Sequence, residues 1–450
     1  MTNADLYRQH LAALDTWLAD ALQRAAAKGV AADAVLFHAG RAAAYYADDQ
    51  EIVFHPTPHF VRWVPLEGPE HCVLARPGKK PLVVRVAPRD FWYELAPAPA
   101  SWWQGEVELH EVPSFGDVAA VTGPLGRVAY VGGAPEAASE LGIPAALVNP
   151  EALVKPLDWH RATKTAHEIE LTLVAARRAA EGHRVARKAF ESGASEREIH
   201  WAYLQGTGHL EKELPFETIV AYDEKTATLH YQGKRTSIPT GRHTFMLDAG
   251  AACDGYASDI TRTWVRANDP DPVFRELLLG LDALERDLVA MVTPGRPYPE
   301  IHFAAHRKVA ELLCRVGLVK AGPEQAFDQG VTRTFLPHGV GHHLGIQVHD
   351  IGGRQAGPDG GVNPPPAGHP FLRNTRVLEP GHLVTIEPGI YFIPMLMDEL
   401  EAAPAGRLVD WTLARRLVAC GGIRIEDDVL CTAAGPRDLT RDLIQGPRGE

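Results

Sequence analysis

Four acidic residues lie within stretches that are otherwise apolar and β-prone, and this feature most restricts the fold. Glu387 lies in LVTIEPGIYF and Glu426 in CGGIRIEDDVL, while Asp248 and Asp259 belong to FMLDAGAACDGYASDITRTWV. A carboxylate inside an apolar strand is costly to bury unless it is paired or bound to a metal. Four carboxylates brought together also repel one another and resist ionisation. One divalent metal relieves this repulsion and two relieve it better, so the pattern favours strands gathered around a dinuclear centre.

The first two carboxylates share a predicted β-hairpin. Asp254-Gly255 lies between two β-rich arms, which is a strong signal for a hairpin turn. If these residues form the turn, Asp248 lies opposite Thr261, and Asp259 lies two residues along the strand of Thr261. Both aspartates then point to one face as diagonal neighbours at roughly 7–8 Å. For this segment alone, an exposed hairpin face with two solvated aspartates remains the alternative.

Residues 335–350, FLPHGVGHHLGIQVHD, combine four histidines with three glycines. Each glycine weakens a helix by roughly 1 kcal/mol relative to alanine, and Pro337 stands just before the first histidine. We therefore expect a loop or a short extended strand, in which the histidines converge by the path of the backbone. For any single histidine the alternative is an accidental polar loop, but the carboxylates elsewhere in the chain favour a shared site.

Composition restricts the class of protein further. A chain of 450 residues predicts two or three domains, and a net charge of −12 argues against a nucleic-acid or membrane-surface partner. The five cysteines are widely spread with no C-x-x-C pair, which favours neither a disulfide framework nor a thiolate zinc site. With no signal-peptide core and no run of about 20 apolar residues, we expect a reduced, soluble, cytoplasmic protein.

The chain changes character near residue 158. Upstream, the apolar runs AVLFHAG, PLVVRVAP and RVAYVGG alternate with helical stretches and predict a small α/β domain over residues 1–157. Downstream, KTAHEIELTLVAARRAAEGHRVARKAF predicts a long helix, and Ser195 with Glu198 fits a capping box that starts another. Residues 158–450 form the second predicted domain. Residues 353–370 are predicted to be a long loop, and loops of that length are often functional.

These residues resemble the metallopeptidases of the pita-bread fold, which are the methionine aminopeptidases, aminopeptidase P and the prolidases. The motifs LDAG, SDITRT, PHGVGH, QVHD, TIEPGIYF and GIRIEDD occur in the family's order over residues 155–437. TIEPGIYF, followed by a long insert and then Trp411, is most similar to bacterial Xaa-Pro dipeptidases. The resemblance implies an α/β (α+β) chain, with a small N-terminal domain followed by a catalytic domain built on a curved antiparallel sheet.

The resemblance also implies a metal centre and its ligands. Two divalent ions, Mn2+ first and Co2+ or Zn2+ as alternatives, are expected to hold a bridging hydroxide. Asp259 and Glu426 would bridge the ions, Asp248 would bind one, and His342 and Glu387 would bind the other. Glu387 would also accept a proton as general base.

The resemblance assigns further roles around these ligands. His230 and His349 match the two catalytic histidines that stabilise the tetrahedral intermediate. His338 would line the substrate pocket, whereas His343 has no family role and is expected to be a bystander. Phe216 stands where bacterial relatives tend to have tyrosine, which puts the rate, the metal occupancy and phosphotriester hydrolysis in question.

Three arginines are candidates for binding the substrate. Arg373 lies where prolidases place the arginine that binds the substrate's C-terminal carboxylate, with two parallel hydrogen bonds. Arg376 is an alternative in the same segment, although a surface position is expected for it. Arg424 would support the substrate pocket or the metal ligands.

We therefore predict a metal-dependent dipeptidase that releases proline from Xaa-Pro dipeptides. Aminopeptidase P-like cleavage of longer peptides is the alternative within the family, and a non-catalytic peptide-binding module is the alternative from another class. Hydrolysis of organophosphate triesters is a further activity that the resemblance implies. A homodimer is expected, with residues 91–103 reaching the neighbouring subunit.

Overall fold

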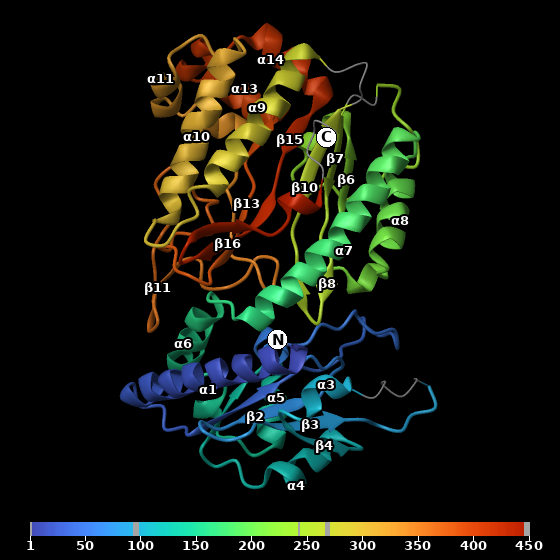
Figure 1. Cartoon of the computed structure of the whole chain (residues 1–450), viewed down its shortest axis with the longest axis vertical. Coiled ribbons are helices and arrows are strands. Elements are labelled where there is room, and N and C mark those ends of the chain that lie inside the picture. The colour runs from blue at the N-terminus through green and yellow to red at the C-terminus, as the bar shows by residue number, and fades with distance from the viewer. Residues whose placement is uncertain (1, 93–98, 242–243, 266–270, 445–450) are drawn as a thin grey trace. The chain divides into compact units, whose positions relative to one another are not determined.

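The protein is described here by a computed structural model that covers residues 2–92, 99–241, 244–265 and 271–444. The chain divides into two compact units (Figure 1). The first unit comprises Met1–Leu171 with Ala356–Gly361, and the second comprises Thr172–Gln355 with Val362–Glu450. The predicted domain division at residues 157 and 158 stays a prediction. Among the residues just given, no helix has both the length and the apolar character needed to cross a membrane.

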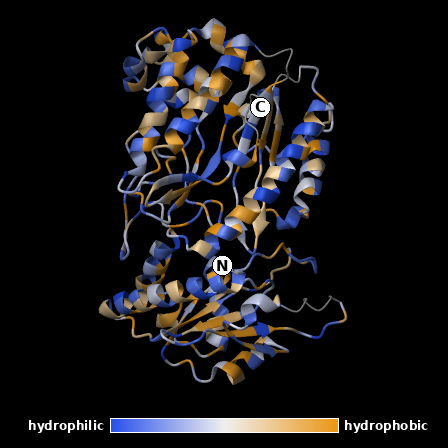
Figure 2. Cartoon of the chain, in the orientation of Figure 1, coloured by the Kyte–Doolittle hydropathy of each residue, from blue (hydrophilic) through white to orange (hydrophobic). Residues whose placement is uncertain are grey.

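The first unit is built on a five-stranded mixed sheet of order β4-β3-β2-β1-β5, whose central strands are predominantly apolar (Figure 2). β1 pairs in parallel with β5 and antiparallel with β2, while β3 and β4 are parallel. The predicted apolar runs form β1, β3 and β5, which confirms the small α/β domain. The strands are β1 Ala34–His38, β2 Cys72–Ala75, β3 Leu82–Val86, β4 Glu108–Val112 and β5 Val128–Val131. The helices are α1 Asn3–Ala27, α2 Pro58–Val61, α3 Ser101–Gln104, α4 Val118–Thr122, α5 Pro135–Glu140 and α6 Glu151–Arg161.

The predicted long helix and the capping box after it are both confirmed. The long helix is α7 Ala166–Glu191, and α8 Glu196–Thr207 follows it. The Ser195 side chain accepts from the Glu198 backbone N–H, and the Glu198 carboxylate accepts from that of Ser195, so both backbone donors are satisfied at the start of α8. α8 packs on β6 Ile219–Tyr222, the edge strand of a sheet of order β10-β7-β6.

The hairpin that carries the two aspartates has the predicted register. β7 Thr244–Asp248 pairs antiparallel with β10 Thr261–Val265, and Asp248 lies opposite Thr261. The short strands β8 Ala252–Cys253 and β9 Tyr256–Ala257 lead to the turn. Asp254 and Gly255 both have positive φ, 47° and 85°, as a type I′ turn requires. The sequence therefore specifies the register that aligns the aspartates.

Glu387 and Glu426 lie between strands rather than within them, which corrects the prediction. Glu387 follows β13 Leu383–Ile386 and precedes β14 Gly389–Tyr391, because Pro388 has no N–H to continue the ladder. Glu426 lies between β15 Gly422–Arg424 and β16 Asp427–Thr432, and its N–H donates to the Thr261 carbonyl of β10. β16 also pairs with β17 Gly435–Asp438. Each glutamate therefore marks a point where the backbone leaves one strand pair for another.

Helices cover these strands within the second unit (Figure 1). α9 packs on β13, β14 and β15, and α10 packs on α9, in a core of leucine, isoleucine and valine side chains. The helices are α9 Pro272–Val289, α10 Tyr298–Arg315, α11 Pro323–Asp328, α12 Thr332–Phe335, α13 Pro394–Ala402 and α14 Trp411–Leu417. The predicted long loop at residues 353–370 contains a hairpin of β11 Gln355–Gly357 and β12 Gly360–Val362.

A buried ion pair holds the backbone where β10 meets Glu426. The fully buried Arg262 donates through Nη2 to Asp427 Oδ1 at 2.6 Å and through Nη1 to the Glu426 carbonyl at 2.7 Å. Asp427 also pairs with Arg441 at 2.8 Å. The two arginines hold the pKa of Asp427 below its usual value despite its burial. This network fixes the backbone that carries Glu426.

We expect Arg262→Met to lower the free energy of unfolding by about 3–5 kcal/mol, because it leaves part of a buried carboxylate without its cation. Urea unfolding followed by circular dichroism measures the change. Arg184, which pairs with Glu181 on the exposed face of α7, offers the matched control. Arg184→Met should leave the unfolding midpoint almost unchanged, and equal losses in the two variants would contradict the role of Arg262.

Candidate metal centre

Three predicted ligands come together in the interior of the second unit. Asp259, His342 and Glu426 are buried, and one ligand atom from each lies within 4.8 Å of the others. His342 Nε2 lies 3.6 Å from Asp259 Oδ2 and 3.5 Å from Glu387 Oε1. Asp248 stands at the end of β7, and its buried Oδ1 has no hydrogen-bond partner among the described residues. The donor set of carboxylates and one imidazole, with an unsatisfied buried oxygen, fits divalent cations.

The predicted loop at the histidine segment is confirmed, and it orients His342 toward the carboxylates. His342 Nδ1 lies 2.9 Å from the His343 carbonyl, which fixes Nδ1 as the protonated nitrogen and leaves the Nε2 lone pair available. The His342 N–H donates to Thr385 Oγ1 at 3.2 Å. Gly341, with φ of 153°, lies so close to the Thr385 carbonyl that an added Cβ would be 2.0 Å from the oxygen. Only glycine allows this approach of the loop to β13.

Burial and mutual repulsion raise the pKa values of the carboxylates. Burial, Asp248 and Asp428 hold the pKa of Asp259 well above its usual value. Burial, with Asp259 next in effect, does the same to Glu426. Burial raises the pKa of Glu387 to about 8, although Arg424 and Arg373 oppose the shift. The carboxylates therefore lack sufficient positive charge from the protein, as expected of a cation site.

Arg424 is buried and bonded to protein groups. It donates through Nη2 to Asp248 Oδ2 at 2.6 Å and through Nη1 to the Tyr391 hydroxyl at 3.0 Å. The same hydroxyl lies 2.8 Å from His338 Nε2. These bonds give Arg424 a position from which it orients Asp248. Its predicted contact with substrate stays a prediction.

The other predicted histidines lie around this centre. The His349 ring is 4.4 Å from that of His342, centroid to centroid, and His338 Nδ1 is 3.7 Å from Glu387 Oε2. Burial lowers the pKa of His349 to about 4, and Arg373 and His230 add to the shift by their charge. His230 is exposed in a turn, so it is not a buried structural histidine. All three are therefore close to the carboxylates or to one another.

The structure distinguishes Arg373 from Arg376. Arg373 is exposed, and its charge acts on His342, His349 and Glu387, as a substrate-binding group at the mouth of the site would. Arg376 is buried, and burial lowers its pKa to about 10. The expectation of a surface position for Arg376 is therefore wrong, because its backbone is bonded to Tyr298 at the start of α10.

Two threonines support the ligands and were not identified from the sequence. Thr261 Oγ1 donates to Glu426 Oε2 at 2.6 Å, and Thr385 accepts the backbone N–H of His342 and bonds the Glu387 carboxylate. Both lie two residues from a predicted ligand in strand sequence, at Asp259-x-Thr261 and Thr385-x-Glu387. This spacing of two residues from a predicted ligand was the signal in the sequence by which the two threonines could have been identified. His343, the predicted bystander, is buried with its ring against that of His382.

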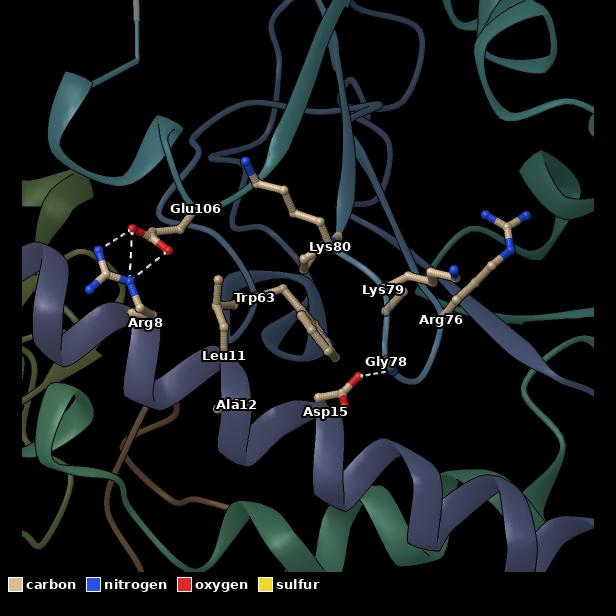
Figure 3. Close-up of a pocket in the computed structure, with 12 residues that line it drawn as sticks. Arg8, Leu11, Ala12, Asp15, Trp63, Arg76, Gly78, Lys79, Lys80 and Glu106 are labelled. Atoms are coloured by element: carbon tan, nitrogen blue, oxygen red, sulfur yellow. Dashed lines mark hydrogen bonds and ion pairs between the residues drawn. The ribbon is translucent and has the colours of Figure 1, made fainter.

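A pocket of about 220 Å³ lies elsewhere, in the first unit (Figure 3). Trp63 lines it between α1 and the β2–β3 turn, and several of its charged groups are bonded to protein partners. Arg8 pairs with Glu106 at 2.7 Å, and Asp15 accepts the Gly78 N–H at 2.8 Å. None of the predicted site residues lines this pocket, so it is separate from the metal centre.

Comparison with known proteins identifies the family. Residues 170–433 match metallopeptidase family M24, and residues 5–159 match the N-terminal domain of Xaa-Pro dipeptidase. The chain therefore belongs to metallopeptidase family M24. It is 38% identical over 445 residues to a Xaa-Pro dipeptidase of Stenotrophomonas maltophilia (strain R551-3), covering 99% of this chain and 98% of that protein. A Xaa-Pro dipeptidase of Xanthomonas campestris pv. campestris (strain 8004) is 39% identical, with 98% of both chains covered.

Solved structures share the fold. Aminopeptidase PepP of Pseudomonas aeruginosa aligns with a TM-score of 0.71 and 25% identity, over 95% of this chain and 96% of that one. A zinc-substituted aminopeptidase P of E. coli in complex with product aligns with a TM-score of 0.71 and 21% identity, over 96% of both chains. These alignments confirm the predicted small N-terminal domain and the pita-bread domain after it.

We expect Thr261→Val to weaken metal binding by about 10–100-fold, because Glu426 loses the hydrogen bond that orients it. Equilibrium dialysis against Mn2+ with elemental analysis measures the affinity. Thr263 is the matched control, since it is buried two residues further along β10 and its hydroxyl, among the described residues, is bonded to the Arg424 backbone alone. Equal affinity losses in Thr261→Val and Thr263→Val would show that β10 packing, and not the bond to Glu426, is responsible.

The raised pKa of Glu387 predicts how the stability of the metal-free protein depends on pH. Between its ordinary value of 4.5 and about 8, the folded chain keeps a proton at Glu387 that the unfolded chain releases. Folding is therefore disfavoured progressively as the pH rises through this window. In chelator-treated protein, wild type should lose stability relative to Glu387→Gln from about pH 4.5 to 8, measured by urea unfolding. Glu399→Gln, at an exposed glutamate of α13, should follow wild type, and a constant difference for Glu387→Gln would contradict the shift.

Proposed function

We propose that the chain is a metal-dependent dipeptidase that hydrolyses Xaa-Pro dipeptides and releases free proline. The buried cluster of Asp259, His342 and Glu426 carries the proposal, because these groups lie together without enough protein charge to balance them. Membership of family M24 and nearly full-length identity to proteins named Xaa-Pro dipeptidase support the substrate class.

Two divalent ions, most simply Mn2+, are proposed for this centre. Asp248, Asp259, His342, Glu387 and Glu426 would hold them. The carboxylate-rich donor set suits Mn2+, and Co2+ or Zn2+ fits the same ligands. When bound, such ions lower the pKa of water and polarise the scissile carbonyl.

The chain's own residues would then move the proton and stabilise developing charge. Glu387, whose pKa of about 8 in the metal-free chain reflects its burial, would accept a proton from water and deliver it to the leaving proline nitrogen. His230 and His349 would donate hydrogen bonds to the oxyanion of the tetrahedral intermediate. His338, held by Tyr391, would line the substrate pocket beside Glu387.

Arg373 is proposed to select dipeptides. Its guanidinium is exposed and acts by charge on Glu387 and His349, so a carboxylate bound to it would stand next to the scissile bond. Two parallel hydrogen bonds would fix that carboxylate. Arg424 would act by orienting Asp248.

We also propose a cytoplasmic homodimer. Phe91 and Trp92 are highly exposed aromatic residues, which favours a contact with a second copy. Trp103 is fully buried within its own unit and is not available to a neighbour. Residues 93–98 of the proposed contact lie outside the described part of the chain.

We expect the Mn2+-loaded protein to release proline from Leu-Pro and the chelated protein to release none. Arg373→Met should raise the KM for Leu-Pro by about 10–100-fold, since a hydrogen bond to a charged group contributes about 1.5–3 kcal/mol. Leu-Pro-amide is the matched control, because it lacks the carboxylate and should be cut poorly by both proteins.

Equal cleavage of Leu-Pro and Leu-Pro-amide by the wild type would contradict the role of Arg373 and favour aminopeptidase P-like activity on longer peptides. No cleavage with Mn2+ demonstrably bound would contradict the dipeptidase. That result would favour a peptide-binding module. The effect of Phe216, whose ring lies beside Gly250 just after β7, would then be tested next. Diethyl paraoxon serves in the same assay to test the organophosphate activity.

A further inference from the structure

Three histidines form a second cluster that the proposed function does not use. His302 and His306 lie one turn apart on α10, and His369 reaches them from the segment after β12. The ring centroids are 4.6 Å apart for His302 and His306, 4.7 Å for His302 and His369, and 4.6 Å for His306 and His369. One ring nitrogen from each histidine lies within 4.8 Å of the others. We call these three residues the histidine triad.

The hydrogen bonds of the triad leave two ring nitrogens unsatisfied. His302 Nε2 lies 2.8 Å from His369 Nδ1, and His306 Nδ1 lies 3.0 Å from Thr332 Oγ1. The His302 and His306 side chains are only 1% exposed. Their remaining ring nitrogens, His302 Nδ1 and His306 Nε2, are buried and have no hydrogen-bond partner among the described residues. A buried polar group left without a partner costs about 1–3 kcal/mol. The triad therefore has two ring nitrogens that no hydrogen bond of the described residues uses.

We propose that the histidine triad binds a divalent transition metal of the Zn2+ type, at a site separate from the carboxylate centre. A His-x-x-x-His pair on one helix face with a third histidine from another segment supplies three imidazoles, the ligands that suit Zn2+. Ideal tetrahedral Zn–N bonds of about 2.0–2.1 Å place ligand nitrogens about 3.3 Å apart. Coordination would draw one nitrogen of each ring, now within 4.8 Å of the others, to that separation.

The chemistry of the surroundings favours a borderline ion over Mn2+. The triad contains no carboxylate, and Phe303 borders it through its edge-on contact with His369 at 5.3 Å. Burial lowers the pKa of His302 to about 3 and that of His306 to about 2, so both rings are neutral at pH 7 and keep their lone pairs. The Arg333 side chain also acts on His306 and His369 by charge, but it is exposed and screened by water.

The Thr332 contact gives the triad the support that metal-binding histidines usually have. His306 Nδ1 lies 3.0 Å from the Thr332 hydroxyl; with Nδ1 protonated, this bond orients the ring and leaves Nε2 with the free lone pair. Thr332 belongs to α12, which packs on α10. The ion would therefore join α10 to the segment of His369, four residues before Arg373.

Full-length protein with Asp259→Asn and Glu426→Gln, which removes the carboxylate centre, tests the proposal directly. We expect this variant to bind Co2+ in equilibrium dialysis at one ion per chain, with the strong visible absorption of four-coordinate Co2+, and to exchange it for Zn2+. Adding His369→Phe should abolish both the bound ion and the absorption. His209→Phe is the matched control at a half-buried loop histidine and should change neither signal.

The same histidine substitutions, made in the wild-type protein, distinguish a failure of this proposal from a failure of the proposed function. His369→Phe should lower Co2+ binding by one ion per chain while Mn2+ binding at the carboxylate centre is kept. Far-ultraviolet circular dichroism and urea unfolding verify that each variant is folded. If His369→Phe does not fold, Thr332→Val replaces it and should weaken Co2+ binding by about 10–100-fold. Absence of bound Co2+ in the carboxylate-depleted variant, or an unchanged spectrum with His369→Phe, would overturn the proposal.

Discussion

The repulsion among buried carboxylates is the constraint on which the second unit depends. Asp259, Glu387 and Glu426 all have raised pKa values, and the cations that oppose these shifts, Arg424 and Arg373, do not offset them. Holding such groups together requires a scaffold that resists their separation. The strand pairing of β7 with β10, and the bond from the Glu426 N–H to the Thr261 carbonyl, supply that scaffold.

Two consecutive residues show how the fold separates a structural acid from a candidate ligand. Asp427 points to Arg262 and Arg441, which lower its pKa, whereas Glu426 points to the other carboxylates, and its pKa is raised. Both are fully or nearly fully buried, so burial alone does not distinguish them. The protein cations around them do, because Asp427 is paired with two arginines that balance its charge, whereas Glu426 faces mainly other carboxylates.

Local sequence rules predicted those features that local geometry determines. The Asp254-Gly255 turn specified the register of β7 and β10, and the capping box at Ser195 specified the start of α8. The positions of the carboxylates as candidate ligands followed from the cost of burying them. The resemblance to M24 enzymes, confirmed by the family match, supplied the pita-bread fold and the order of the site residues.

Features that depend on distant segments were not predicted. The burial of Arg376 follows from the packing of its segment against the start of α10, which the sequence around it does not indicate. The contact of Arg424 with Asp248 joins residues 176 positions apart. Glu426 lies where the backbone changes from pairing with β14 to pairing with β13, which is a property of the strand arrangement rather than of its own segment.

Two His-x-x-x-His pairs in the second unit show why spacing alone does not define a metal site. His338 and His342 lie in a glycine-rich loop, where His338 Nε2 is bonded to the Tyr391 hydroxyl and His342 Nε2 faces Asp259 and Glu387. His302 and His306 have the same spacing on α10, where the helix places both rings on one face. The loop therefore adds one imidazole to a carboxylate centre, whereas the helix assembles a site made of imidazoles. Backbone conformation, which the glycines decide, determines which kind of ion each pair suits.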